Sequence, residues 1–302
     1  MENTRKHTRE LLQSANLSPR KRFGQNFLVN TRVLDSIVEA AELSSEDIVL
    51  EIGAGTGALT KRLALSSSKV IAVELDEGLF HLLQSTFQDN SDVTLIHADI
   101  LDLDLSTLID EVAGPGSESR RIKVIGNLPY YITTPILMKV LEESPMLPLP
   151  VQMVLTMVQK EVGQRIAAAS PGTKAYGALS IAIAYRSDAK ILRHVPATSF
   201  YPKPKVDSVL IRLNVKPTPS VDVKDERFFF RVVRAAFQYR RKTLRNALQM
   251  ACKAGAIQLT IGAVDDALQA LGLDEKRRGE TLSISEFAAL ANTIQRQSEV
   301  ML

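Results

Sequence analysis

The chain has 302 residues, of which 45% are hydrophobic and 24% are charged. These values are ordinary for globular proteins, and they exclude a disordered or a collagen-like chain. No apolar run reaches the roughly 18 residues that a membrane span needs, and the opening MENTRKHTRE lacks the apolar segment of a secretory signal. Cys252 is the only cysteine, which excludes an intrachain disulfide and a cysteine-cluster metal site, so we expect a cytoplasmic protein.

The first half of the chain alternates strand and helix patterns. Short apolar runs predict buried strands at 47–51, 69–74, 93–97, 122–126 and 151–158. Helical periodicity lies between them at about 58–65, 77–87 and 134–142, and composition predicts a loop at 114–119. This alternation is typical of an α/β fold with a mostly parallel sheet and helices on both faces.

The pattern changes after Val195. A loop with two prolines at 197–207 leads to a predicted strand at 208–213 and a linker at 216–220. The helical period dominates beyond it, at about 225–238, 242–252, 263–271 and 285–297. We therefore expect three parts: a basic N-terminal extension at 1–22, an α/β domain at 23–216 and a small all-helical domain at 217–302.

Charge is distributed unevenly along the chain, whose formal net charge is +3. Residues 227–253 carry eight basic side chains and no acidic one, and residues 1–22 carry six basic and two acidic ones. The remainder of the chain is therefore acidic. Such asymmetry favours a polyanion-binding face, because a solvated face usually mixes the two signs. Two solvated helical faces remain the alternative interpretation.

A glycine-rich turn, Glu51-Ile-Gly-Ala-Gly-Thr-Gly57, lies between the first predicted strand and helix. Glycines there allow the backbone to turn sharply and to approach a ligand, and Gly53, Gly55 and Ala58 also satisfy a dinucleotide-binding pattern. The carboxylate of Glu51 would repel a pyrophosphate and attract a cofactor with a cationic ammonium group.

Two further carboxylates are predicted at the same edge of the sheet. Glu74 ends the second strand and suits a ribose diol, and Asp99, at the end of the third, could accept a hydrogen bond from an adenine amino group. The arrangement resembles the S-adenosylmethionine-binding half of class I methyltransferases. The alternative is a plain strand–helix turn with solvated carboxylates.

The tetrad Asn127-Leu-Pro-Tyr130 follows the fourth strand directly. The carboxamide oxygen of Asn127 and the carbonyl oxygen of Leu128 could accept both N–H bonds of an adenine amine, which would expose the nitrogen lone pair. Pro129 would stiffen the turn, so that the acceptors are placed in advance. Tyr130 offers a flat face on which an extruded base can stack. The alternative is a β-turn with a core tyrosine.

A second stacking ring is predicted at Phe200, in Ser199-Phe-Tyr-Pro-Lys-Pro204, although a core aromatic is nearly as good an interpretation of that residue. No cysteine lies near the fourth strand for pyrimidine-carbon methylation, and the four histidines show no metal-ligand or triad spacing. We therefore expect amine methylation without a metal.

The sequence resembles the bacterial 16S rRNA adenine N6,N6-dimethyltransferase family over about residues 20–291. Seven blocks carry the resemblance, in this order: Lys21-Arg-Phe-Gly-Gln-Asn-Phe-Leu28, Glu51-Ile-Gly-Ala-Gly-Thr-Gly57, Val73-Glu-Leu-Asp76, Ala98-Asp99, Gly126-Asn-Leu-Pro-Tyr130, Pro202-Lys-Pro-Lys-Val-Asp-Ser208 and Gln238-Tyr-Arg-Arg-Lys-Thr-Leu-Arg-Asn246. The implied fold is a Rossmann-like class I methyltransferase sheet with a small all-helical C-terminal domain.

The resemblance also implies particular site residues. S-adenosylmethionine contacts are implied at Asn26, Leu28, Gly53, Glu74, Asp99 and Asn127, to which the glycine turn adds Gly55. The helical domain is implied to bear on RNA, and its candidate RNA contacts are Arg234, Arg240, Arg241, Lys242 and Arg245. Residues 1–19 receive no role beyond a possible basic arm.

The expected activity is formation of N6,N6-dimethyladenosine at two adjacent adenines near the 3′ end of 16S rRNA, in the small ribosomal subunit, by a monomer without a membrane partner. Three other functions compete with it. They are a large-subunit rRNA adenine methyltransferase that confers antibiotic resistance, a DNA adenine methyltransferase, and a non-catalytic assembly factor that keeps the fold. The block at 238–246 favours the small subunit.

Overall fold

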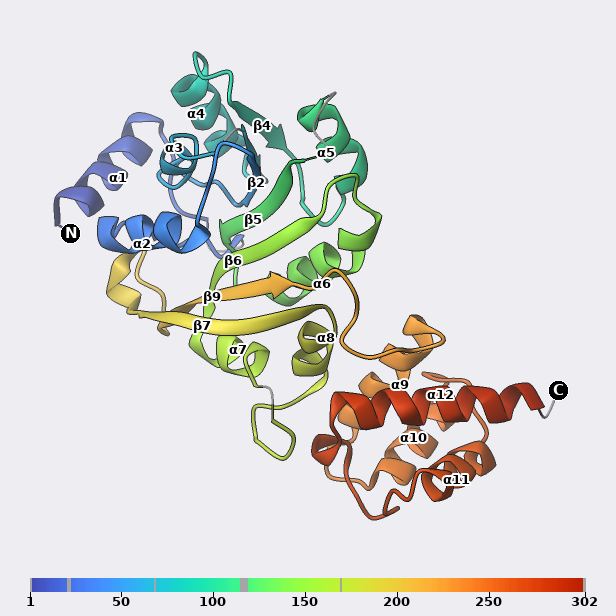
Figure 1. Cartoon of the computed structure of the whole chain (residues 1–302). Coiled ribbons are helices and arrows are strands. Elements are labelled where there is room, and N and C mark those ends of the chain that lie inside the picture. Colours follow the sequence, from blue (N-terminus) through green and yellow to red (C-terminus); the bar gives the residue numbers. More distant parts are fainter. Residues whose placement is uncertain (1, 21–22, 68, 115–118, 169, 301–302) are drawn as a thin grey trace. The chain divides into compact units, whose positions relative to one another are not determined.

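The structure, a computed structural model, describes residues 2–20, 23–67, 69–114, 119–168 and 170–300 (Figure 1). Lys21 and Arg22 of the first family block lie outside the described residues, as does most of the loop predicted at 114–119. The chain divides into two compact units: residues 1–163 with 188–217, and residues 164–187 with 218–302. The α/β domain expected at 23–216 includes residues 164–187, whereas in the structure these residues group with the C-terminal helices.

The first unit contains a seven-stranded sheet in the order β4-β3-β2-β5-β6-β9-β7. The strands are β2 (Asp47–Ile52), β3 (Lys69–Glu74), β4 (Val93–His97), β5 (Arg121–Asn127), β6 (Val151–Gln159), β7 (Ser187–Val195) and β9 (Ser208–Val215). The pairs from β4 across to β6 are parallel, and β6 pairs with β9 antiparallel. The class I α/β sheet predicted from the sequence is confirmed.

The centre of the sheet explains why these strands form. Every residue of β2 is buried, and β3 and β5 are buried along nearly their whole length, as expected for strands covered on both faces. Ile52 pairs with Gly126 where β2 and β5 end. A Cβ atom on Gly126 would lie 2.4 Å from the carbonyl oxygen of Ile52, so only glycine fits at this point.

Helices flank the strands in chain order: α2 (Thr31–Ala41), α3 (Thr60–Leu63), α4 (Glu77–Phe87), α5 (Leu105–Ala113) and α6 (Thr133–Glu143). Side-chain caps define several of their starts. Asp76 caps α4 by accepting from the backbone N–H groups of Gly78 and Leu79, and Asp104 caps α5 in the same way. These caps fix where the chain leaves each strand end.

The N-terminal arm forms a helix, α1 (Glu2–Ser14), that the sequence patterns did not predict. Leu12 packs with Phe27 and Leu79 in a small apolar cluster. The guanidinium of Arg5 donates to the carbonyl oxygens of Thr198 and Phe200, 3.0 Å away in each case. The arm is therefore seated on a two-stranded ribbon in which β1 (Phe27–Leu28) pairs antiparallel with β8 (Phe200–Tyr201).

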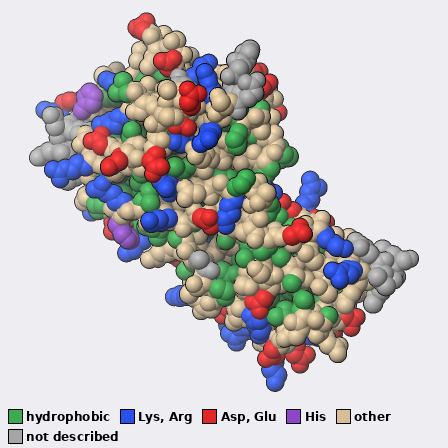
Figure 2. Space-filling model, in the orientation of Figure 1, with side chains coloured by type: hydrophobic (Ala, Val, Ile, Leu, Met, Phe, Trp, Pro, Cys, Tyr) green, Lys and Arg blue, Asp and Glu red, His purple; other side chains and the backbone are tan. Residues whose placement is uncertain are grey.

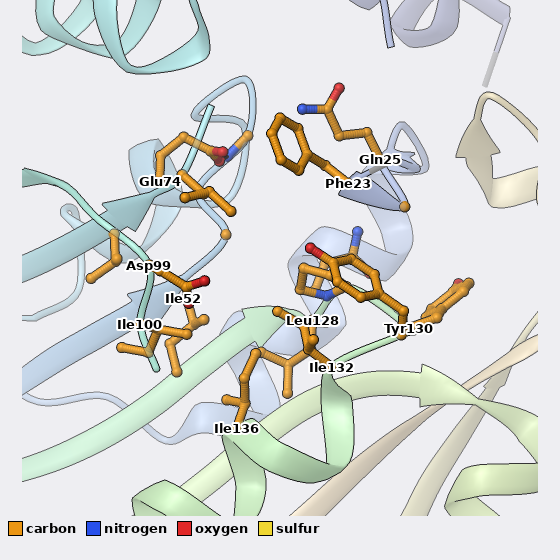
Figure 3. Close-up of a pocket in the computed structure, with 18 of the residues that line it drawn as sticks. Phe23, Gln25, Ile52, Glu74, Asp99, Ile100, Leu128, Tyr130, Ile132 and Ile136 are labelled. Atoms are coloured by element: carbon orange, nitrogen blue, oxygen red, sulfur yellow. Dashed lines mark hydrogen bonds between the residues drawn. The ribbon is translucent and has the colours of Figure 1, made fainter. Parts of the chain in front are cut away.

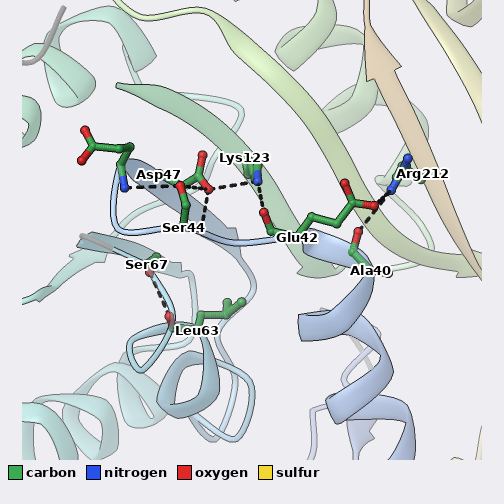
Figure 4. A network of polar contacts seen from close by, with 9 residues as sticks. Ala40, Glu42, Ser44, Asp47, Leu63, Ser67, Lys123 and Arg212 are labelled. Atoms are coloured by element: carbon green, nitrogen blue, oxygen red, sulfur yellow. Dashed lines mark hydrogen bonds and ion pairs between the residues drawn. The ribbon is translucent and has the colours of Figure 1, made fainter. Parts of the chain in front are cut away.

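A buried ion pair joins β2 and β5 at the edge of the sheet opposite to their carboxyl ends (Figure 4). The ammonium of Lys123 lies 2.9 Å from a carboxylate oxygen of Asp47 and also donates to the carbonyl oxygen of Glu42 at 2.6 Å. Both side chains of the pair are nearly inaccessible, at 6% and 5% exposure. Removing either partner would leave a buried charge uncompensated.

The second unit is helical, with α8 (Ala178–Arg186), α9 (Glu226–Gln238), α10 (Leu244–Lys253), α11 (Ile261–Ala270) and α12 (Ile284–Val300). Helix α7 (Lys160–Ile166) contains residues of both units. Tyr185, Phe229 and Phe230 form a set of ring contacts in the core of the second unit. The four helices predicted beyond residue 220 are confirmed to within about three residues at their ends.

Candidate functional site

An open cavity lies at the carboxyl ends of β2, β3, β4 and β5, and its empty space, open solvent included, is about 750 Å³ (Figure 3). Its walls come from the residues just after these strands, from the start of α6 and from a segment near the N-terminus, Phe23–Phe27. This is the edge at which ligands bind in open parallel sheets. Most of the wall is apolar, with a few polar groups directed inward, as in small-molecule sites.

The glycine turn lies at one side of this cavity. Gly55 has a φ of 60°, and a Cβ atom there would meet the ring of Phe27 at 3.3 Å. The N–H of Gly55 donates to Oε2 of Glu74 at 2.8 Å. The turn thus presents bare backbone to the cavity and fixes the carboxylate at the end of the neighbouring strand.

Glu74 is held by two backbone donors. Its Oε2 accepts from Gly55, and its Oε1 accepts from the N–H of Asp76 at 2.9 Å. Burial raises the pKa of Glu74 above its ordinary value, and the two backbone N–H groups partly oppose the shift. The side chain is therefore a fixed acceptor with 7% of the residue exposed. Asp99, two residues beyond β4, lines the same cavity and accepts from the N–H of Leu101.

Glu51 is buried without a hydrogen-bond partner for its Oε2 among the described residues. Burial raises the pKa of Glu51 to about 8, the neighbouring Thr60 partly opposes the shift, and the nearby charge of Glu74 adds to it. Glu51 lines a second cavity together with Gly53 and Asn127, which also line the first. A buried carboxyl oxygen without a partner at this point is what a cationic ligand group would compensate.

Asn127 ends β5, and its carboxamide has two different environments. The Nδ2 atom donates to the carbonyl oxygen of Asn26 at 2.7 Å. The Oδ1 atom is buried and has no hydrogen-bond partner among the described residues. An unpaired acceptor of this kind is costly unless a ligand donates to it, so the oxygen is available for a donor bound in the cavity.

Tyr130, the last residue of the tetrad, lines the cavity. Its hydroxyl forms a 2.6 Å hydrogen bond with the hydroxyl of Ser208. Burial raises the pKa of Tyr130, and the Ser208 hydroxyl partly opposes that shift. The ring is thus anchored at its far end and remains neutral at physiological pH.

The structure brings most of the predicted site residues together. The residues that line the first cavity are Asn26, Gly53, Gly55, Glu74, Asp99, Asn127, Leu128, Pro129 and Tyr130. Leu28 lines the second cavity instead.

Phe200 requires a correction. It is fully buried, at 0% exposure, in the hydrophobic core with Leu28 and Leu34, and it lines neither cavity. Pairing of β8 with β1 turns the ring of Phe200 into the core, so it is not placed to clamp a base. The core interpretation of this aromatic was the right one.

Several residues that line the cavity were not predicted as site residues, among them Phe23, Gln25 and Tyr131. Phe23 and Gln25 belong to the first family block, and Tyr131 directly follows the tetrad, with 54% of its surface exposed. These residues therefore lie within or beside the family blocks of the sequence. No sequence pattern, however, showed that the N-terminal segment crosses the carboxyl edge of the sheet.

The five candidate RNA contacts in the helical unit fall into two groups. Arg234, Arg241 and Lys242 are exposed. Arg240 is exposed as well, but its guanidinium binds the carboxylate of Glu280 at 2.9 Å, and Arg245 forms a two-bond pair with Asp265. Acidic and basic side chains also stand close together over the face seen in Figure 2. Only part of the basic segment is therefore free for a polyanion.

No described group of three or more histidine, cysteine, aspartate or glutamate side chains is arranged to hold a metal ion. Within the same ranges, no helix has the length and apolar character that crossing a membrane requires.

Comparison with known proteins identifies relatives over nearly the whole chain. The profile of the ribosomal RNA adenine dimethylase family matches residues 16–290. A ribosomal RNA small subunit methyltransferase A from Bacillus mycoides is 47% identical over 291 residues, and its counterpart from Bacillus pumilus is 45% identical over 289, each match covering 96% of both chains.

Two solved structures share the fold. A dimethyladenosine transferase from Plasmodium falciparum superposes with a TM-score of 0.70 at 24% identity, covering 89% of this chain and 97% of that one. The 23S rRNA methyltransferase ErmE gives 0.62 at 21% identity, covering 89% and 100%.

Proposed function

The chain belongs to the ribosomal RNA adenine dimethylase family, and from that premise we propose that it is an S-adenosylmethionine-dependent enzyme that dimethylates adenine N6 in small-subunit rRNA. The specific target is two adjacent adenines near the 3′ end of 16S rRNA. The enzyme acts as a monomer in the cytoplasm, where the small subunit is assembled.

The cavity residues fit S-adenosylmethionine group by group. Glu74, held by two backbone N–H groups, accepts from the ribose hydroxyls, and Asp99 accepts from the adenine amine. The unpaired carboxyl of Glu51 faces the space where the ammonium of the methionine part belongs. A cation there lowers the pKa of Glu51 and so restores its charge. When bound, the cofactor supplies an electrophilic methyl group on its sulfonium.

The unpaired Oδ1 of Asn127 is the observation that carries the proposal. This oxygen accepts one N–H of the adenine amine, and the carbonyl oxygen of Leu128 accepts the other, which turns the nitrogen lone pair toward the methyl group. Bound S-adenosylmethionine would supply the methyl group to this nitrogen, which would then release a proton to water. No strong base is needed, because the nitrogen is cationic by then.

The second transfer differs from the first. The monomethylated amine keeps one N–H, so one of the two acceptors is left unfilled while the new methyl group occupies part of the cavity. Tyr130 holds the base through both transfers by stacking, and Ser208 holds the ring of Tyr130. Stacking of about 1–3 kcal/mol offsets part of the few kcal/mol needed to extrude the nucleotide.

The test uses the purified chain, labelled S-adenosylmethionine and two substrates: small subunits that lack the modification and large subunits. Nucleoside analysis should detect N6,N6-dimethyladenosine only in the small-subunit RNA. Label in the large subunit would favour the competing rRNA methyltransferase, and label in neither would contradict the enzyme assignment.

A further inference from the structure

The two carboxylate oxygens of Asp76 bind different parts of the chain: one binds the start of α4 and the other binds Arg20 and Gln25. Its Oδ1 accepts from the N–H groups of Gly78 and Leu79 and so caps α4. Its Oδ2 lies 3.0 Å from the guanidinium of Arg20 and accepts from the side-chain amide of Gln25 at 3.2 Å. The side chain is only 3% exposed. A cap alone needs one oxygen, so the second set of contacts calls for another explanation.

The second set of contacts leads to the wall of the cofactor cavity. Gln25 lines that cavity beside Phe23 and Asn26, and Figure 3 shows Phe23 and Gln25 on the side nearest Glu74. The backbone N–H of Arg20 donates to Oε1 of Gln25 at 2.7 Å, which closes a small network around Asp76. Segment 23–28 is therefore tied to the strand that ends in Glu74.

Apolar packing supports the same attachment independently. A Cβ atom on Gly78 would lie 2.5 Å from Cδ2 of Leu17, so the start of α4 is shaped to receive the N-terminal arm. Leu79, which lines the cofactor cavity, packs with Leu12 of α1 and with Phe27. The arm thus rests against the same turn of α4 that Asp76 caps.

The far end of the segment reaches the catalytic amide. The carbonyl oxygen of Asn26 accepts from Nδ2 of Asn127 at 2.7 Å, and this bond determines which way the carboxamide faces. If segment 23–28 moves, Asn127 loses the acceptor that keeps its Oδ1 directed at the substrate. The contacts of Asp76 therefore extend, through Gln25 and Asn26, to the reacting amine.

We propose that Asp76 is a positioning residue for methyl transfer. By binding Arg20 and Gln25 while capping α4, it holds segment 23–28 against the cofactor cavity and thereby orients Asn127. The inference rests on the proposed function, since it assigns Asp76 a part in that reaction. It touches neither the cofactor nor the base, and acts only through the segment.

Asp76→Asn separates the two tasks of this residue. Asparagine caps a helix as well as aspartate does, but its amide nitrogen cannot accept from Arg20 or Gln25. Asp104→Asn is the matched control, because Asp104 caps α5 through two backbone N–H groups and lines neither cavity. Loss of a charge-assisted contact predicts about a tenfold weaker binding of S-adenosylhomocysteine by calorimetry in Asp76→Asn, with no change in Asp104→Asn.

Two further measurements exclude a general structural effect. Hydrogen exchange at the backbone amides of residues 26–29 should speed up in Asp76→Asn, while the amides of Gly78 and Leu79 stay as protected as in the parent chain. Arg20→Met should weaken binding in the same direction, and Arg20→Lys should recover most of the affinity. In turnover, kcat should fall along with the affinity, since Asn127 loses its orientation.

The outcomes distinguish a failure of the positioning role of Asp76 from a failure of the proposed function. Parental affinity and kcat in Asp76→Asn would overturn the role of Asp76 and leave the enzyme assignment standing. Faster exchange at Gly78 and Leu79 would also overturn it, because loss of the cap would then explain the defect. A parent chain that neither binds S-adenosylhomocysteine nor methylates RNA would overturn the proposed function itself.

Discussion

The carboxamide of Asn127 donates to the carbonyl oxygen of Asn26 and keeps its own oxygen unpaired in a buried position. The two residues are 101 positions apart in the chain. One bond therefore joins the N-terminal segment of the cavity to the end of β5, and it gives the amide a direction that the strand alone would not impose.

Asn127→Ala should lower kcat by a factor of about 100 to 1,000 at saturating cofactor, the usual loss when one preorganised group at a reacting centre is removed. The rate of methyl incorporation into small-subunit RNA measures this kcat. Asn90→Ala, in a surface turn, is the control and should keep full activity. A kcat for Asn127→Ala within threefold of the parent would remove this residue from the mechanism.

Tyr130→Ala should reduce kcat/KM for RNA by roughly 5- to 150-fold, which corresponds to the loss of one stacked base. Tyr130→Phe keeps the ring but loses the bond to Ser208, so we expect only a few-fold reduction, matched by Ser208→Ala. Equal losses in the Phe and Ala variants would show that the hydroxyl, not the ring face, is what matters.

Phe200→Leu tests the corrected position of that residue. Because Phe200 is a core side chain, the change should cost about 1–2 kcal/mol in the free energy of unfolding and leave kcat/KM nearly unchanged below the melting transition. Chemical denaturation and turnover on the same sample give both numbers. A large drop in kcat/KM at parental stability would restore the clamp interpretation.

Glu51 should make stability depend on pH. Its pKa rises from 4.5 in the unfolded chain to about 8 in the fold, so the unfolded state ionises first as the pH increases. The free energy of unfolding should therefore fall from pH 5 to pH 8, by on the order of 1–3 kcal/mol. Glu51→Gln should lack this slope, be more stable than the parent at pH 8, and bind S-adenosylmethionine more weakly. If the free energy of unfolding depended on pH in the same way in the parent and in Glu51→Gln, the raised pKa would not belong to Glu51.

The basic segment should divide into binding and structural residues. Arg241→Gln with Lys242→Gln should weaken RNA binding and reduce the slope of log Kd against log salt by nearly one unit for each lost phosphate contact. Arg245→Gln should instead destabilise the helical unit, because it leaves Asp265 unpaired. Anisotropy titrations across a salt series distinguish the two, and an unchanged slope in the double variant would show that these charges do not meet phosphate.

Much of the sheet could be predicted because its strands are short apolar runs followed by glycine or a carboxylate. The helix at 77–87 was predicted with its observed ends, since Asp76 is a strong N-cap. β7 was missed because its residues alternate irregularly between buried and exposed, as on a sheet edge. α8 was missed for the opposite reason: its continuous apolar stretch has no helical stripe.

The site was predictable where a residue lies at a strand end and unpredictable where it arrives from elsewhere. Glu74, Asp99 and Asn127 follow from the parallel sheet alone. Phe23 and Gln25 depend on how the N-terminal arm seats on α4, which local patterns do not encode. Phe200 failed because a two-residue ribbon gives no periodicity from which to choose the face of an aromatic ring.

Gly126 has a consequence for laboratory evolution. It is the last residue before Asn127, and a Cβ atom there would meet the carbonyl oxygen of Ile52 at 2.4 Å. Even alanine would wedge β2 and β5 apart at the point where the cavity begins. In a library that randomises each codon of this strand, active clones should keep glycine at position 126. Position 121, where Arg121 is exposed, should tolerate many residues. Comparing the two positions therefore shows how stringent a selection for activity is.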